Sequence, residues 1–218
     1  MELPFTKEQF LNVFELYNLT VFPIQIVFYL LAFLSIILLF KPVIRKNRII
    51  SATLFSLWIW IGIVYHILFF STINKAAYFF GILFVIQAIL FFVYGFVKDK
   101  FNFEYQKSNK NLLGIFFVFY ALIIYPVLGF FFGHHYPKSP TFGLPCPTTI
   151  FTFGILLFTT KRIPVALVLI PLIWSIIGFG AAVSLTIFED YGLLISGLIS
   201  FVLILISNNK LSKLKSEQ

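Results

Sequence analysis

Apolar residues form long blocks along this chain, and charged or Pro- and Gly-rich joints separate the blocks. None of the blocks contains Asp, Glu, Lys or Arg. A helix that rises about 1.5 Å per residue needs about 20 apolar residues to cross about 30 Å of hydrocarbon, where it satisfies its own backbone groups. The pattern therefore predicts an all-α integral membrane bundle of seven transmembrane helices in a single domain, residues 1–218. The predicted spans are 19–40, 49–70, 76–97, 112–132, 148–160, 163–187 and 191–206.

The composition agrees with this class. Hydrophobic residues make up 60% of the chain and charged residues 11%, and the mean hydropathy is +1.00. Soluble domains are about 45–50% apolar and about 25% charged. The blocks are apolar on every side rather than alternating with period two, so the pattern does not fit the strands of a membrane β-barrel.

Basic residues predict the orientation, because short cytoplasmic loops retain Lys and Arg. Three basic residues, Lys7, Lys75 and Lys138, fall on the side that also carries Glu2, Glu8, Glu15, Glu189 and Asp190. The other basic residues follow spans one, three, five and seven: Lys41, Arg45, Lys46, Arg48, Lys98, Lys100, Lys107, Lys110, Lys161, Arg162, Lys210, Lys213 and Lys215. We therefore expect the N-terminus outside and the C-terminus inside. The dispersed charge suits anionic lipid and not nucleic acid.

A short amphipathic segment precedes the first span. Thr6-Lys7-Glu8-Gln9 matches a helix-capping pattern, and Phe10, Phe14 and Tyr17 follow at helical spacing. We expect an interfacial helix at about residues 7–17. It is either an anchor in the headgroups, which its amphipathic character favours, or a lid over an outward-facing pocket. The N-terminus lacks the basic region of a cleavable signal peptide, so we expect the first span to be retained.

The fifth block is too short to cross the bilayer alone. Thr148–Thr160 has 13 residues, which reach only about 20 Å. Since Lys161 and Arg162 hold its inner end, the preceding Leu144-Pro145-Cys146-Pro147 must dip inward from a recessed Pro-rich outer loop. With Thr148 or Thr149 as its cap, the helix would point free N–H groups at the interior. The loop is either a structural plug, the favoured reading, or a ligand-contacting segment.

Several polar residues fall on the same predicted outer side and are candidate ligand contacts. They are His66, His134, His135, Cys146, Thr148, Glu189 and Asp190. Their nitrogen, sulfur and oxygen donors make a metal site conceivable, but no HxxxH or CxxC spacing supports one. A nucleophile–base pair of Cys146 with His134 or His135, oriented by Asp190, is the sharpest enzyme hypothesis. Nothing in the spacing requires that pair to meet, so no residue is predicted to be catalytic or to bind metal.

Inside the spans the polar residues are few. No block contains a carboxylate, which disfavours proton or sodium coupling. Gln25, Gln87 and Ser175 either line a path for a neutral solute or hydrogen-bond helix to helix. Pro171 predicts a kink in span six. Small residues at four-residue intervals in spans six and seven predict close helix packing: Gly178 and Ala182, Gly180 and Ser184, then Gly192, Ser196 and Ser200.

The chain resembles an uncharacterised bacterial family, domain-of-unknown-function family 6064. The matching stretches are PFTKEQFLNVFELYN, VYHILFFSTIN, YPVLGFFFGHHYPKSPTFGLPCPTTIFTFG, IPLIWSIIGFGAA and EDYGLLISG. The resemblance covers most of the chain. It implies a multi-pass protein of the bacterial inner membrane, a kind sometimes labelled a permease without a demonstrated substrate, and it supplies no site residues.

Together these features predict a protein that binds or passes a small solute through an outward-facing polar pocket. The alternatives are a metal- or thiol-dependent membrane enzyme, which is less favoured, and a non-catalytic subunit of a membrane complex. The predicted partners are the lipid bilayer and a small solute. The sequence does not identify the solute, a cofactor or an oligomeric state.

Overall fold

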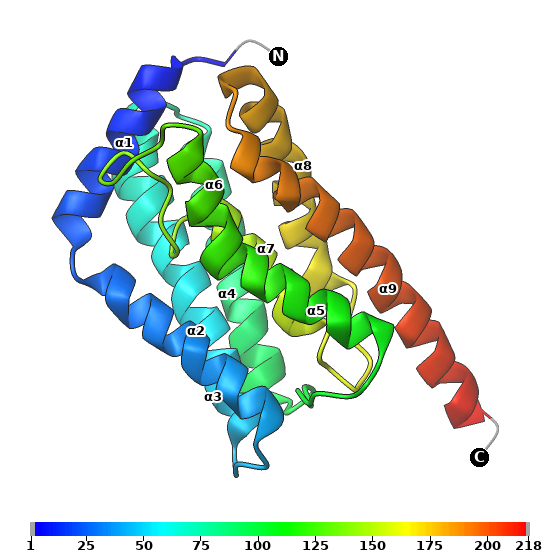
Figure 1. Cartoon of the computed structure of the whole chain (residues 1–218). Helices are drawn as coiled ribbons and strands as arrows, with labels where there is room; N and C mark the ends of the chain where they lie inside the picture. The colour runs from blue at the N-terminus through cyan, green and yellow to red at the C-terminus, as the bar shows by residue number, and fades with distance from the viewer. Residues whose placement is uncertain (1–2, 217–218) are drawn as a thin grey trace.

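A computed structural model of the chain describes residues 3–216 and shows a bundle of helices, with no strand in that range (Figure 1). Glu2, counted above on the outer side, and the side chain of Lys215 lie outside the described part. The elements are, in order, α1 Lys7–Val21, α2 Ile24–Phe40, α3 Lys46–Trp60, η1 Ile61–Phe69, η2 Phe70–Thr72, α4 Ala77–Phe92, η3 Val93–Val97, α5 Asn109–Phe119, η4 Tyr120–Ile124, α6 Tyr125–Phe131, α7 Pro145–Leu156, α8 Ala166–Leu185, η5 Phe188–Asp190 and α9 Tyr191–Ser216.

Within residues 3–216, five continuous helices are long and apolar enough to cross a membrane. They are Lys46–Thr72, Ala77–Val97, Asn109–Phe131, Ala166–Leu185 and Phe188–Leu214. Five of the predicted blocks, at 49–70, 76–97, 112–132, 163–187 and 191–206, coincide with them. The other two blocks correspond to a bent pair and to a short helix. The structure thus supports five spans, or six with the bent pair counted as one, and the count of seven stays a prediction.

The bent pair is α1 and α2, which meet at 86°. Helix α1 continues to Val21, four residues beyond the predicted end at residue 17, and α2 begins at Ile24. Pro23 lies at the break, where its missing N–H ends the hydrogen-bonding pattern of a continuing helix. The Thr6 cap is confirmed, with Thr6 and Gln9 forming both hydrogen bonds of a capping box. The predicted start of span one at residue 19 is wrong, because residues 19–21 belong to α1.

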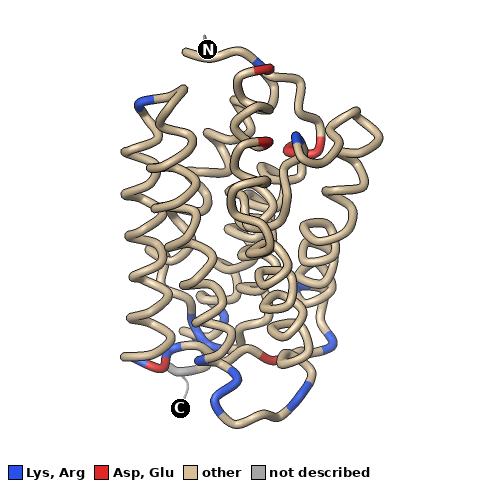
Figure 2. The backbone as a smooth tube through the Cα atoms, turned by 90° about the vertical axis from the view of Figure 1, so that its left-hand side faces the viewer, with Lys and Arg blue, Asp and Glu red and all other residues tan. Residues whose placement is uncertain are grey.

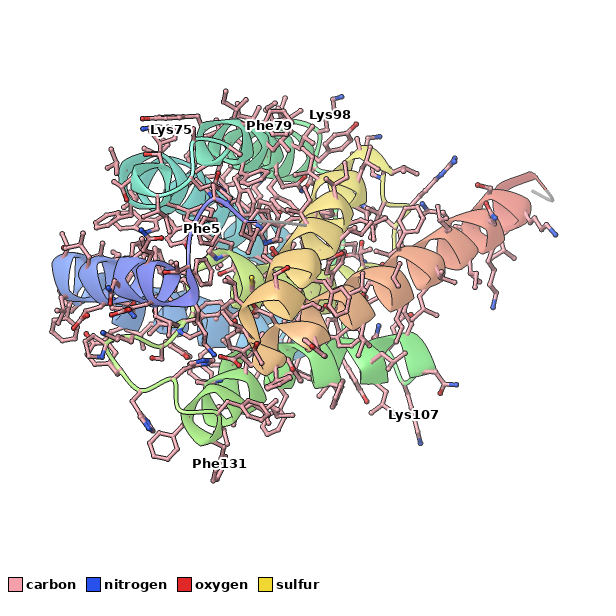
Figure 3. The ribbon with its side chains drawn as sticks, turned by 90° about the horizontal axis from the view of Figure 1, so that it is seen from above. Phe5, Lys75, Phe79, Lys98, Lys107 and Phe131 are labelled. Carbon is pink, nitrogen blue, oxygen red and sulfur yellow. The ribbon has the colours of Figure 1, made fainter. Side chains whose placement is uncertain are left out.

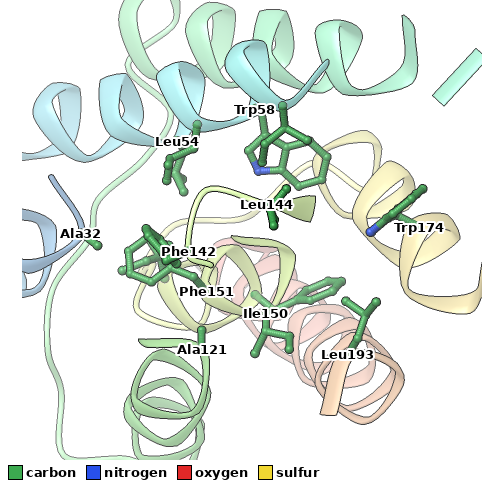
Figure 4. Close-up of a cluster of buried hydrophobic side chains, with 14 of the residues drawn as sticks. Ala32, Leu54, Trp58, Ala121, Phe142, Leu144, Ile150, Phe151, Trp174 and Leu193 are labelled. Carbon is green, nitrogen blue, oxygen red and sulfur yellow. The ribbon is translucent and has the colours of Figure 1, made fainter. Parts of the chain in front are cut away.

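The short helix α7 lies in the middle of the bundle (Figures 1 and 4). It has 12 residues, and all of them except Cys146 are buried. Helices α5, α8 and α9 pack around it, and Ile150 and Phe151 lie in the central apolar cluster that Figure 4 shows. Because protein surrounds α7, its polar backbone ends do not face lipid.

Polar side chains bind the carbonyl groups at the lower end of α7. Asn111 Nδ2 donates to the Leu157 carbonyl at 2.8 Å, and Lys110 Nζ donates to the Thr159 carbonyl at 2.8 Å. A helix end leaves carbonyl groups without partners inside the helix, and a cation there also complements the helix dipole. These contacts fix the inner end of the short helix.

Two helices lie very close together at a pair of glycines that the sequence pattern did not mark. A Cβ added to Gly62 would lie 2.9 Å from the Gly81 carbonyl, and one added to Gly81 would lie 2.8 Å from the Gly62 carbonyl. By contrast, Gly180 and Ser184 are exposed, and nothing lies within 4 Å of the Cβ position of Gly180. The predicted packing role of the Gly180 and Ser184 pair is therefore wrong, because these two residues lie on the outer face of α8.

The polar residues at mid-span make hydrogen bonds within the bundle. Pro171 in α8 has no N–H to donate to the Leu167 carbonyl, and Gln87 Nε2 of α4 donates to that carbonyl at 3.0 Å. Gln25 Nε2 donates to the Asn18 carbonyl at 3.0 Å, and Ser175 Oγ donates to the Leu172 carbonyl at 2.7 Å. We interpreted these residues either as the lining of a solute path or as hydrogen-bond partners between helices, and the hydrogen bonds in the structure match the second interpretation.

Candidate functional site

The loop between α6 and α7 is held against α1 by one buried asparagine. Asn18 Nδ2 donates to the Pro137 carbonyl at 2.7 Å and to the Ser139 carbonyl at 2.8 Å. The hydroxyl of Thr141 donates to Asn18 Oδ1 at 2.7 Å. An ion pair of 3.4 Å between Lys138 and Glu15 adds a contact at the surface. The loop is therefore ordered by α1 and leads directly into the N-terminal end of α7.

The start of α7 differs from the sequence prediction. The helix begins at Pro145 with Leu144 as its N-cap, and no side chain caps it. Thr148 N–H already bonds to the Leu144 carbonyl, and Thr149 Oγ1 donates to the Pro145 carbonyl. The prediction that Thr148 or Thr149 caps the helix is wrong. Prolines at the first and third positions remove two of the terminal N–H groups, so the end is a weaker donor array than predicted.

A cavity of about 330 Å³ lies above this end of α7. The N-terminal segment, α1, η1, the loop, α4 and α8 contribute its walls. Phe5, Phe10 and Phe14 line it on one side, where Phe5 stacks on Phe10 and meets Phe70 edge to face. Figure 3 places Phe5 near the centre of the bundle when it is seen from above. The N-terminal segment and α1 therefore form one wall of the cavity.

The polar side chains at the base of the cavity come from three separate parts of the chain. Cys146 of α7, Trp174 of α8 and Asp190 of η5 all line it. The hydroxyl of Tyr125 donates a short hydrogen bond to Asp190 Oδ1, and Asp190 also interacts with the Cys146 thiol. The rest of the lining is mostly aromatic and aliphatic, so the cavity is less polar than the sequence suggested.

Next to the cavity, His134 and Glu189 form a buried pair. His134 Nδ1 lies 2.6 Å from Glu189 Oε1. The second nitrogen of His134 and the second oxygen of Glu189 are buried and have no hydrogen-bond partner in the described part of the chain. Gly129 leaves room for the pair, since a Cβ there would lie 3.3 Å from Glu189 Oε1. These residues stabilise the turn before α9 and do not line the cavity.

Two buried carboxylates begin the last long helix. This helix starts at Phe188, so Glu189 and Asp190 form its first turn and precede the predicted span 191–206. The η5 turn packs against α6 and α8 and continues directly into α9, and both side chains are buried.

His66 and His135 are separate from this cluster. His66 is fully buried in the π-helical segment η1, and neither ring nitrogen has a hydrogen-bond partner. Its ring packs on Phe84 and Trp174, with centroids at 4.7 and 5.1 Å. His135 is exposed and packs on Phe130. Thr148 is buried behind the cavity lining with its hydroxyl unpaired.

The geometry does not assemble the proposed thiol–imidazole pair. His134 bonds to Glu189, His135 faces outward, and the thiol of Cys146 interacts with Asp190. Within residues 3–216 no three His, Cys, Asp or Glu side chains are grouped so that they could hold a metal ion.

Sequence reasoning missed Tyr125 and Trp174 as part of the site. Tyr125 precedes Pro126 in an apolar run, and nothing in that local pattern marks it. Trp174 had a weak signal, because it lies three residues after the kink at Pro171 and is a polar-tipped residue within a span. Seven residues were named from their chemistry, and of these only Cys146 and Asp190 line the cavity.

Comparison with known proteins gives one result. A family model described as Family of unknown function (DUF6064) matches residues 7–215. No curated protein and no solved structure matches the chain. The match covers nearly all of the sequence, including α1, the loop, α7 and the turn before α9. The chain belongs to the Family of unknown function (DUF6064).

Proposed function

We propose that this chain is a multi-pass protein of the bacterial cytoplasmic membrane that binds a small solute from outside, as a permease does. The N-terminus lies outside and the C-terminus inside. The cavity between the N-terminal lid and the start of α7 carries this proposal, because it is large enough for a small molecule and has polar side chains at its base.

The distribution of charge supports the orientation. Lys and Arg gather at the lower end of the bundle, whereas more of the acidic residues lie toward the other end (Figure 2). Basic residues concentrate on the cytoplasmic side of membrane proteins. The cavity lies at the end with fewer basic residues, so it faces outward in this orientation.

The path of the chain supports seven crossings. Helix α6 ends near the top of Figure 1, and α8 runs upward from the lower half of the bundle. The chain must therefore descend between Phe131 and Ala166, and the loop followed by α7 makes this descent inside the protein. Helix α2 makes the first descent below the bend at Pro23. Together with the five long spans, α2 and the segment from the loop through α7 give seven crossings. The crossing that contains α7 is only partly helical, because the loop forms its upper part.

The single cysteine provides a direct test of the cavity. In spheroplasts, a small impermeant reagent, 2-(trimethylammonium)ethyl methanethiosulfonate, is expected to modify Cys146, and a bulky impermeant stilbene maleimide to react much more slowly. The Cys146→Ser variant gives the background. Modification only in inside-out vesicles contradicts the orientation. Equal rates with the small and the bulky reagent contradict an enclosed cavity.

The same labelling distinguishes passing from binding. A permease that alternates its access exposes Cys146 to the small reagent from the cytoplasmic side as well, at a rate that rises when solute is present. A protein that only binds exposes Cys146 from outside alone. The enzyme reading has no comparable support, because the thiol has no imidazole beside it.

A further inference from the structure

The polar atoms of the cavity converge at one corner beside Gly178. A Cβ at Gly178 would lie 3.7 Å from Trp174 Nε1 and 3.8 Å from Cys146 Sγ. Both atoms therefore lie close to Gly178, whose Cβ position Leu193 Cδ2 approaches to 2.7 Å. Gly178, Trp174 and Cys146 all line the cavity.

Trp174 has an unused hydrogen-bond donor at this corner. Its side chain is only 8% exposed, and its Nε1 has no oxygen or nitrogen acceptor in residues 3–216, where only the thiol of Cys146, a weak acceptor, interacts with it. An indole N–H is a donor only, and a buried donor without a partner costs free energy. A ligand atom that accepts this hydrogen bond removes that cost.

Asp190 supplies acceptor capacity close by. Its carboxyl group accepts from Tyr125 and interacts with Cys146. A carboxylate has about four acceptor positions on its two oxygens, so these contacts do not exhaust it. The corner thus combines one unused donor with a carboxylate that can accept another hydrogen bond.

The remaining lining sets the character of the rest of the ligand. Among the described residues no Lys, Arg or His lines the cavity, and the other lining side chains are apolar apart from Tyr65, Tyr125 and Asn74. An anionic ligand would meet Asp190 with no opposite charge to offset it. A cationic ligand would suit Asp190 but would leave the N–H of Trp174 without an acceptor.

Resting on the proposed function, we propose that the cavity binds an uncharged molecule with an apolar body and a hydroxyl group. The hydroxyl oxygen accepts from Trp174 Nε1–H, and the hydroxyl proton is donated to the Asp190 carboxyl group. The apolar body lies among Phe5, Phe10 and Phe70. One hydroxyl group satisfies both sides of the corner because it is a donor and an acceptor.

The test uses three probes of similar size on the full-length protein in nanodiscs: p-cresol, toluene and 4-methylbenzylammonium. Each is scored by the free aqueous concentration that halves the rate at which N-ethylmaleimide modifies Cys146. In Trp174→Phe and in Asp190→Asn, this concentration is expected to rise about tenfold for p-cresol and to stay unchanged for toluene. Comparing variants cancels the different partitioning of the probes into lipid.

Trp60→Phe is the matched control, because its indole N–H bonds to Tyr17 and Trp60 does not line the cavity. It is expected to leave p-cresol protection unchanged. The inference is overturned if both variants weaken p-cresol and toluene equally, or if 4-methylbenzylammonium protects best and depends on Asp190 alone. In either case solute binding itself stands. If Cys146 remains reactive from outside but no probe protects it, both the inference about the hydroxyl group and the proposal that the cavity binds a solute fail.

Discussion

The Nδ1 atom of His134 lies 2.6 Å from the Oε1 atom of Glu189, although 55 positions separate these residues in the sequence. Both side chains are buried. The contact joins the loop after α6 to the turn before α9, where the neighbouring Asp190 lines the cavity. Removing one partner of a buried pair leaves the other polar group buried without a partner, which destabilises the folded state.

His134→Ala is therefore expected to destabilise the protein by about 3 kcal/mol. Thermal unfolding in detergent, followed by loss of the monodisperse peak in size-exclusion chromatography, measures this. His135→Ala is the control, since His135 is adjacent but exposed. If the two variants have equal melting temperatures, the buried pair does not stabilise the fold.

Asn18 is expected to control the order of the loop before α7. Asn18→Asp keeps the size of the side chain but removes the two N–H donors to Pro137 and Ser139. Because two partly buried carbonyl groups lose their partner, hydrogen exchange of residues 136–144 is expected to accelerate by about tenfold or more.

The matched control for this experiment is Asn12→Asp, an exposed position on the same helix. It introduces the same charge into α1 without touching the loop. Unchanged exchange in Asn18→Asp would show that the remaining loop contacts are sufficient.

The contact between Gly62 and Gly81 is expected to tolerate no side chain. Gly62→Ala or Gly81→Ala brings a methyl group within about 3 Å of a backbone carbonyl on the facing helix, which costs about 1–3 kcal/mol through overpacking. The melting temperature in detergent is expected to fall for each variant.

Gly180→Ala provides the control within α8, where the added methyl group meets nothing within 4 Å. Since Ala is the better helix former, this variant is expected to be neutral or slightly more stable. If Gly180→Ala lowers the melting temperature as much as Gly62→Ala does, the loss in Gly62→Ala does not come from the close contact between the two helices.

The N-terminal segment is expected to limit access to the cavity. Phe5→Ala removes a ring that contacts Phe10 and Phe70. Deleting a buried aromatic ring costs about 3 kcal/mol or more, and about 1.4 kcal/mol of lid opening is a factor of ten. Modification of Cys146 from outside is therefore expected to accelerate at least about tenfold.

Leu16→Ala tests the specificity of that effect, because Leu16 lies on the exposed face of α1. Its labelling rate is expected to match the parent chain. An unchanged rate in Phe5→Ala would show that reagents reach the cavity by a route that the lid does not cover.

The sequence predicted the helical class and most of the long helices correctly, since both depend on local runs of apolar residues. The five long helices fall on predicted blocks, the Thr6 cap is where its motif placed it, and the fifth block is indeed too short to cross alone. The wrong predictions concern where a helix begins and which face of a helix packs against its neighbours. The cap at Thr148 and the packing of Gly180 were assigned from spacing, and spacing does not identify which neighbour a residue meets.

The amino-acid sequence by itself determined that this is a bundle of apolar helices with one short member, because chain length against bilayer thickness and the absence of charge are properties of each segment alone. Only the tertiary structure decided that Cys146, Trp174 and Asp190 share a cavity while His66 and His135 do not. That grouping depends on the rotation and depth of helices that are far apart in the chain, and side-chain packing across the whole bundle sets both.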